Sequence, residues 1–180
     1  VGETYILREE FAPYGYLKAE EVEFTITDTA EIQKVEMKDD VPIGRIIINK
    51  KGEFLSEVSW NDMVAGAMDS IWGYVTGSLK DVTFEIYARE DIKAADGESD
   101  DYYKKDELVA TIKTDELGIA RTDDLPLGKY YVVEKETADG FVLDGEPRDI
   151  DLTYRDQDTP VVTFDSEWQN SRQKAKVIVT

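Results

Sequence analysis

Three polar side chains, Lys50, Glu134 and Asn170, occupy strand positions where an apolar residue is expected. Because successive side chains of a strand point to opposite faces, Lys50 shares the face of Ile46 and Ile48. Glu134 and Asn170 end two further apolar faces in the same way. The apolar members of those faces are Tyr130 and Val132 on one strand, and Val162, Phe164 and Trp168 on the other. Buried charge persists only where it is paired, neutralised or consumed, so we predict that the three polar groups meet in the interior.

An amine, a carboxyl group and a carboxamide in one buried site can form a covalent bond. Burial disfavours charge, which leaves a nucleophilic lysine and a glutamic acid that relays protons. We expect the Lys50 nitrogen to attack the carboxamide carbon of Asn170 while Glu134 polarises the carboxamide oxygen. Ammonia would leave and an isopeptide bond would remain. The reaction happens once per molecule, so the chain is not expected to be an enzyme.

Each of these residues also has an ordinary structural explanation when taken alone. Lys50 would extend its amine to solvent at a strand end, Glu134 would pair with it, and Asn170 would cap a turn. All three residues, however, lie on the apolar face of their own strand, and this shared placement favours the cross-link instead.

The elements that must position these groups are short strands separated by turn residues. The strand-like runs are rich in β-branched and aromatic residues. They span residues 4–9, 22–27, 32–38, 44–50, 82–88, 108–113, 129–134, 148–153, 160–168 and 175–180. This density of strands predicts an all-β fold, an antiparallel Greek-key-like β-sandwich.

One segment departs from the β pattern. Apolar residues between Trp60 and Val75 recur at helical spacing. We therefore expect a short helix or an irregular excursion within an insertion, residues 52–80, between the first two strands of the central domain. Two interpretations stay open, namely an apolar stripe packed on the sandwich, and an exposed ligand patch built on Trp60 and Trp72.

The sequence also repeats itself. Glu9 and Glu134, 125 positions apart, both follow an aromatic–apolar run and precede a Gly–aromatic pair at the same spacing. Asp39 and Asn170 end similar segments that lie 131 positions apart. A repeat of this length predicts tandem domains. The predicted parts are the C-terminal part of a preceding domain (1–42), a complete domain (43–172) and the first strand of a following domain (173–180).

Motifs of the predicted central domain follow a specific order along the chain. They are IIINK at 46–50, VTFEIYA at 82–88, TDELG at 114–118, LPLGKY at 125–130, the Glu134 strand and NSRQK at 170–174. In this set the chain resembles the Cna B-type, prealbumin-like domains of Gram-positive surface adhesins and pilins. The resemblance implies an isopeptide bond between Lys50 and Asn170, with Glu134 as the proton shuttle.

The chain departs from this family pattern at two places. After Glu134, Thr137 and Ala138 replace the usual Ala-Pro pair, a change that we expect to affect a turn rather than the chemistry. In the first copy, Glu9 and Asp39 stand at the glutamate and asparagine positions. Their lysine partner would precede Val1, so we expect this first site to be incomplete and unlinked.

Composition excludes several classes of function. A net charge of −19 disfavours nucleic acid and anionic membranes as partners. The absence of cysteine and histidine excludes Cys nucleophiles, Cys/His zinc sites and Ser-His-Asp catalysis. No signal peptide and no run of roughly 20 apolar residues is seen. Taken with these observations, the family resemblance implies a fragment of an extracellular, cell-wall-attached protein without a cofactor or a metal, whose signal and anchor lie outside this segment.

These observations predict a structural stalk or adhesin module whose partners are neighbouring domains of the same surface protein. The alternative is a module that binds a host protein or a glycan through the Trp60–Trp72 insertion or the loops at the sandwich end. A glycosidase is disfavoured because no recognisable carboxylate pair is present. The acidic loops 96–101 and 156–158 carry oxygen ligands suited to calcium, although solvated turns explain them more simply.

Overall fold

Residues that alternate between apolar and polar, many of them β-branched or aromatic, form the strands of this chain. The structure is a computed structural model that describes residues 1–60 and 70–174. Its strands are β1 (Thr4–Leu7), β2 (Val22–Thr25), β3 (Ile43–Trp60), β4 (Ser70–Ser78), β5 (Thr83–Ala88), β6 (Leu108–Lys113), β7 (Ile119–Arg121), β8 (Leu125–Pro126), β9 (Gly128–Glu136), β10 (Arg148–Leu152) and β11 (Val161–Asn170). No helix occurs in the two described ranges, and the predicted all-β class is confirmed.

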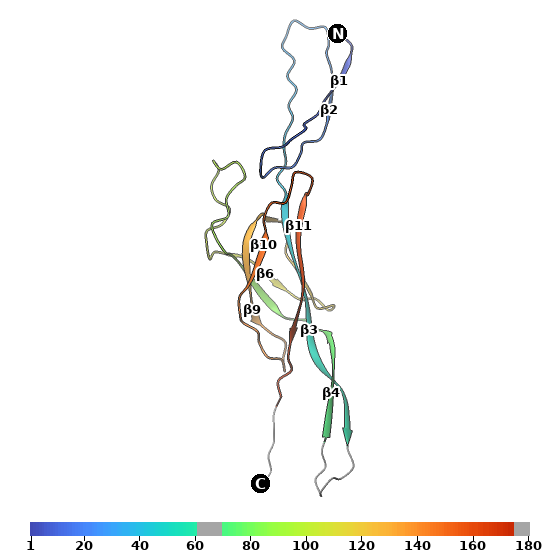
Figure 1. Ribbon diagram of the computed structural model, residues 1–180, viewed down its shortest axis with the longest axis vertical. Coiled ribbons are helices and arrows are strands. Elements are labelled where there is room, and N and C mark those ends of the chain that lie inside the picture. Colours follow the sequence, from blue (N-terminus) through green and yellow to red (C-terminus); the bar gives the residue numbers. More distant parts are fainter. Residues whose placement is uncertain (61–69, 175–180) are drawn as a thin grey trace.

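Two sheets form the central sandwich (Figure 1). One has the strand order β10-β9-β5-β6, and the other has the order β11-β3-β4, with β7 and β8 also paired to β3. All named pairs among the described strands are antiparallel except β3 with β11, which is parallel. The first and last strands of the central unit therefore lie side by side.

The core lies between these two sheets, and its inward residues follow the predicted alternation. Ile46 and Ile48 of β3 and Tyr130 and Val132 of β9 are fully buried. Further core residues are Val82, Phe84, Ile86, Ala88, Ile112, Ile150, Leu152, Val162 and Trp168. Removing this apolar surface from water is the main driving force for folding.

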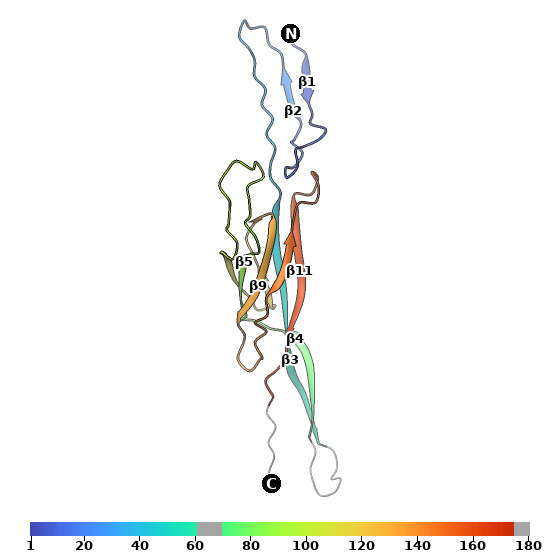
Figure 2. The same ribbon diagram turned by 60° about the vertical axis from the view of Figure 1, so that its left-hand side comes forward.

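The expected helix between Trp60 and Val75 is wrong where the structure describes this segment. β3 continues beyond Lys50 to Trp60 and pairs with β4 as an antiparallel hairpin, with a bulge between Leu55 and Glu57. Strand pairing satisfies the backbone groups, so the partner strand overrides the weak helical spacing. The hairpin extends from the end of the sandwich (Figures 1 and 2). The middle of the predicted helix, residues 61–69, lies outside the described residues.

Residues 1–42 lie at the opposite end of the long axis (Figures 1 and 2). Here β1 and β2 pair as an antiparallel hairpin, and many apolar side chains are exposed. The predicted strand at 32–38 is wrong, because the segment has no strand pairing and runs as an extended coil. No partner strand lies beside it in the described structure to satisfy its backbone groups.

A search of the described residues for a long apolar helix that could span a membrane finds none.

Candidate functional site

The three polar residues singled out in the sequence come together between the two sheets. Lys50 and Asn170 belong to the parallel β3–β11 pair, in which Lys50 lies opposite Trp168 and Asn170 lies opposite Gly52. This register offsets the two side chains by two residues, so they share the inward face. Glu134 comes from β9 in the facing sheet. The exposed fraction is 1% for Lys50 and 2% for Glu134 and Asn170.

The backbone at Lys50 is held from both sides. Its amide donates to the carbonyl of Gly118 at 2.7 Å, and its own carbonyl accepts from the amide of Leu79 at 2.9 Å. Gly118 has a φ of +75°, and a Cβ there would lie 2.5 Å from the Lys50 carbonyl oxygen. Only glycine fits this position easily. The turn at Gly118 thus fixes the base of the lysine side chain.

The side chains make a continuous polar chain. The Nζ of Lys50 lies 2.6 Å from Oε2 of Glu134. The other carboxylate oxygen, Oε1, accepts a hydrogen bond from Nδ2 of Asn170 at 2.5 Å. Glu134 therefore bridges the amine and the carboxamide, one oxygen to each. The sequence predicted a contact between Glu134 and the carboxamide oxygen, whereas the observed contact is with the carboxamide nitrogen.

The electrostatics of the site make the Lys50 amine easier to deprotonate than an exposed lysine. Burial lowers the pKa of Lys50 below its ordinary value of 10.5, and the hydrogen bond and charge of Glu134 oppose this shift. The positive charge of Arg148 lowers the pKa further, while Asp144 raises it. Apart from the Lys50–Glu134 contact, neither Lys50 Nζ nor Glu134 Oε2 has a hydrogen-bond partner in the described structure. Glu134 is thus the one carboxylate in direct contact with the amine among the described residues.

Aromatic rings surround the polar cluster. The Lys50 amine lies 5.7 Å from the centre of the Phe84 ring, which packs edge to face with Trp168 at 5.5 Å. The Phe141 ring closes the space above Gly52, where a Cβ would approach it to 2.5 Å. These walls exclude water, which strengthens every electrostatic interaction inside.

Thr137 is a site residue that the sequence did not predict. Its Oγ1 accepts a hydrogen bond from Asn170 Nδ2 at 2.8 Å. The expectation that the Thr137-Ala138 substitution affects only a turn is therefore too narrow. The departure from the family pattern was a visible signal, but contact with Asn170 depends on how the loop after β9 folds back onto β11.

The incomplete first-copy site is different. Oε2 of Glu9 accepts from the amide of Ala19 at 2.8 Å, within its own segment. Glu9 and Asp39 are both half-buried, and no described hydrogen bond or ion pair joins them. The described contact of Glu9 is thus with the backbone of its own segment, unlike that of Glu134 with Asn170.

Two further predicted sites receive little support. Trp60 and Trp72 lie on β3 and β4, but their side chains are outside what the structure describes, so the ligand patch stays a prediction. In the acidic loops, Asp96 accepts from the amides of Glu98 and Ser99, and Asp156 accepts from the amide of Asp158. These carboxylates cap their own turns. Among the described residues, no group of three or more acidic side chains gathers to hold a metal ion.

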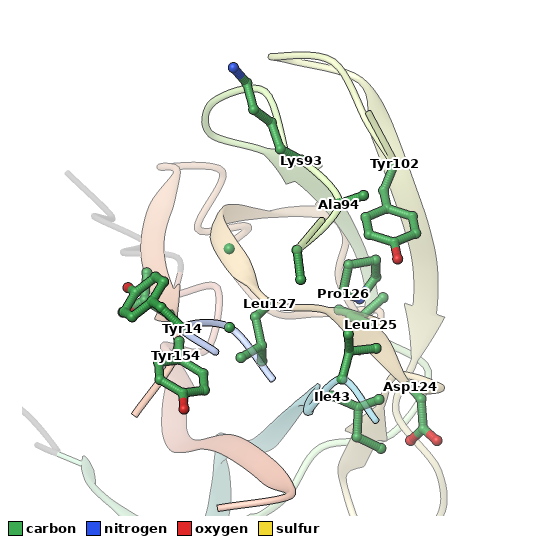
Figure 3. Close-up of a pocket in the computed structure, with 15 residues that line it drawn as sticks. Tyr14, Ile43, Lys93, Ala94, Tyr102, Asp124, Leu125, Pro126, Leu127 and Tyr154 are labelled. Atoms are coloured by element: carbon green, nitrogen blue, oxygen red, sulfur yellow. The ribbon is translucent and has the colours of Figure 1, made fainter. Parts of the chain in front are cut away.

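An apolar pocket of about 460 Å³ lies at the end of the sandwich next to residues 1–42. Figure 3 shows Leu125, Pro126 and Leu127 along it, with Tyr14 and Tyr154 on one side and Tyr102 on the other. Tyr14 and Tyr154 meet edge to face, with ring centres 4.9 Å apart. The pocket belongs to the junction between the N-terminal segment and the sandwich, and it is remote in the fold from Lys50.

Comparisons with known proteins agree with the architecture. Residues 74–168 match the SpaA family of prealbumin-like fold domains. Among solved structures, the Bacillus anthracis TIE protein is 21% identical with a TM-score of 0.53, and the match covers 94% of this chain and 25% of that one. The minor pilin GBS52 of Streptococcus agalactiae is 16% identical with a TM-score of 0.47, covering 99% and 64%.

The major pilin SpaA of Corynebacterium diphtheriae is 18% identical with a TM-score of 0.45, and the match covers 72% of this chain and 31% of the pilin. At 21% identity the likeness to the TIE protein concerns the fold alone. The chain spans between a quarter and two thirds of the length of these proteins. The comparison with curated proteins finds no match.

Proposed function

Because the chain belongs to the SpaA family of prealbumin-like fold domains, we propose that it is a structural stalk module of a Gram-positive cell-surface protein, locked by an isopeptide bond between Lys50 and Asn170. The observation that carries this proposal is the buried contact chain from Lys50 Nζ through both oxygens of Glu134 to Asn170 Nδ2. Its partners are neighbouring domains of the same protein, and its place is outside the cell on the wall. The module turns over no substrate.

The contacts supply a route for both protons that must move. Oε2 of Glu134 takes a proton from the Lys50 ammonium, which leaves a neutral amine. The amine attacks Cγ of Asn170, so that a C–N bond forms to Nζ while the bond from Cγ to Nδ2 breaks. Of the two protons that Lys50 gives up, one passes through Glu134 to the departing nitrogen, which leaves as ammonia. The other stays on the Glu134 carboxyl group.

A tandem arrangement is supported by matching local structure in residues 1–42 and the central domain. The β1–β2 pairing of Thr4 with Thr25 and Leu7 with Val22 parallels the β9–β10 pairing of Lys129 with Asp151 and Val132 with Arg148. Each position is displaced by 125 or 126 residues, as in the sequence repeat. The same register in both hairpins supports the proposal that they are equivalent elements of two like domains.

The turns after these strands also correspond. Gly15 and Gly140 both have positive φ, and the preceding turns carry the hydrogen bonds Tyr16 N to Pro13 O and Phe141 N to Ala138 O. The Leu17 amide donates to the Asp40 carbonyl as the Val142 amide donates to the Ser171 carbonyl. We therefore assign residues 1–42 to the C-terminal part of a preceding domain, and residues 43–172 to a complete one. Residues 173–180 would open a third, although 175–180 lie outside the described residues.

The bond would stabilise the domain by constraining its unfolded state. Lys50 and Asn170 enclose a loop of 120 residues, and the chain-entropy relation gives about 5 kcal/mol for a loop of that size. In a chain without cysteine, this covalent link takes the place of a disulfide.

The mass of the intact protein tests the proposal. We expect the mass to be lower than the sequence mass by one ammonia, and peptide mapping to recover Lys50 joined to Asn170. Lys50→Ala, Glu134→Ala and Asn170→Ala should each restore the full sequence mass apart from the substitution. Lys51→Ala, which removes the neighbouring lysine on the opposite face of β3, is the matched control and should keep the deficit. A wild-type mass equal to the sequence mass would overturn the cross-link.

A further inference from the structure

Thr137 contacts the atom that must leave in the proposed reaction. The two hydrogens on Nδ2 of Asn170 have two acceptors, Oε1 of Glu134 at 2.5 Å and Oγ1 of Thr137 at 2.8 Å. With both acceptors engaged, the plane of the carboxamide is fixed. Oδ1 of Asn170, by contrast, is buried and has no hydrogen-bond partner in the described structure. The carboxamide is thus oriented entirely through its nitrogen.

A threonine hydroxyl suits a nitrogen that changes its hydrogen-bonding character. A carboxamide nitrogen only donates, whereas ammonia also carries a lone pair that accepts. The Thr137 hydroxyl can accept from Nδ2 before the reaction and donate to the ammonia lone pair after the C–N bond breaks. Glu134 also serves as the proton relay, whereas the Thr137 hydroxyl can accept or donate without a change of its own protonation state.

Thr137 also lies between the buried site and the surface. It is half-buried, whereas Asn170 is 2% exposed. On its outer side, Thr137 lines a surface pocket of about 550 Å³ together with Ala138, Phe141 and Leu79. The leaving nitrogen therefore faces a residue that contacts Asn170 and also lines this pocket.

We propose that Thr137 positions the carboxamide of Asn170 for attack and takes up the departing ammonia on its way to the surface pocket. This inference rests on the proposed isopeptide bond between Lys50 and Asn170. It makes Thr137 a residue that sets the rate of bond formation, while Lys50, Glu134 and Asn170 decide whether the bond forms at all.

The rate of cross-linking in newly made protein tests this role. The full chain is synthesised by cell-free translation, samples are denatured at successive times, and cross-linked and open chains are separated by gel mobility and intact mass. Thr137→Val removes the hydroxyl at nearly constant shape, and we expect it to slow bond formation roughly tenfold or more. Thr137→Ser keeps the hydroxyl and should react within about twofold of wild type. Thr83→Val, which removes a hydroxyl bonded to the exposed Glu136, is the matched control and should react as wild type.

A second measurement separates positioning from folding. The same Thr137 variants are made in an Asn170→Ala background that cannot cross-link, and their unfolding by urea is compared. Slow bond formation in Thr137→Val, recovery in Thr137→Ser and equal urea midpoints support the proposal. Wild-type kinetics in Thr137→Val, or slowing that follows a lowered midpoint in both variants, overturn it and leave the cross-link standing. A wild-type chain that never loses ammonia overturns the cross-link itself.

Discussion

Gly52 lies directly opposite Asn170 in the parallel β3–β11 pair, and the Phe141 ring occupies the space that a side chain at position 52 would fill. The absence of a side chain on β3 therefore lets an aromatic ring from the loop after β9 close the polar cluster. Phe141 is 5% exposed, and its backbone bridges to Arg172 just after Asn170. Phe141 thus closes the site over Gly52, and its bridge to Arg172 holds the end of β11 that carries Asn170.

Gly52→Ala should destabilise the domain, because the new Cβ would lie 2.5 Å from Cε1 of Phe141. Overpacking of this kind costs about 1–3 kcal/mol. Urea unfolding in the Asn170→Ala background measures the loss without the cross-link masking it. Gly145→Ala is the control, since its Cβ would meet nothing nearer than the Glu134 carbonyl oxygen at 3.9 Å. Equal midpoints for both alanine variants would contradict the tight closure at Gly52.

The lowered pKa of Lys50 predicts how the open form responds to pH. In the folded state this pKa lies below the unfolded value of 10.5, so between the two values the unfolded chain binds more protons. Stability then rises with pH across this window and levels off above 10.5. Below the folded pKa the penalty for burying the charged amine is present in full.

Urea unfolding of Asn170→Ala as a function of alkaline pH measures this linkage. The double variant Lys50→Met/Asn170→Ala is the control, because it lacks the titrating amine but keeps every other charge. We expect the difference in unfolding free energy between the two proteins to shift in favour of the Lys50 protein as the pH rises toward 10.5. A difference that stays constant would mean that the amine is not desolvated.

The junction between residues 1–42 and the sandwich is organised by Gln157. Its Oε1 accepts from the amide of Ala12 at 2.8 Å, and its backbone carbonyl accepts from the amide of Lys18 at 3.0 Å. Gln157→Ala removes the side-chain bond, so we expect the Ala12 amide to exchange its hydrogen roughly tenfold faster. Hydrogen exchange followed by NMR is the measurement. Gln169→Ala, an exposed position on β11, should leave that amide unchanged, and an unchanged rate in Gln157→Ala would show that the contact does not hold the junction.

The local pattern of the sequence was sufficient to predict the inward faces of three strands. Ile46, Ile48, Tyr130 and Val132 are buried as strand alternation requires, and the polar residue at the end of each face is buried with them. Strand alternation is a short-range property, so it can be recognised in a single segment. The convergence of Lys50, Glu134 and Asn170 follows from it once the strands belong to two facing sheets.

Long-range pairing, in contrast, could not be predicted from local pattern. The parallel pairing of β3 with β11 joins segments more than a hundred residues apart, and nothing in either segment specifies its direction. The helical spacing of apolar residues in β4 does not produce a helix, because β4 pairs with β3, with Trp72 opposite Val58. Thr137 reaches Asn170 only through the fold of the loop between them.

The position of the cross-link in the sheet predicts how the domain bears tension. Force applied through residues 1–42 enters β3 at Ile43, and force at the other end leaves β11 after Asn170. A bond from Lys50 to Asn170 carries the load after the first part of β3, so the 120 residues between them are never stretched. Single-molecule pulling on wild type should therefore show no extension from the central domain. Glu134→Ala, which keeps the chain open, should release roughly 400 Å of contour length, from about 3.4 Å per residue. Lys51→Ala should behave as wild type, and an equal release of length from the wild-type domain would exclude a covalent path between β3 and β11.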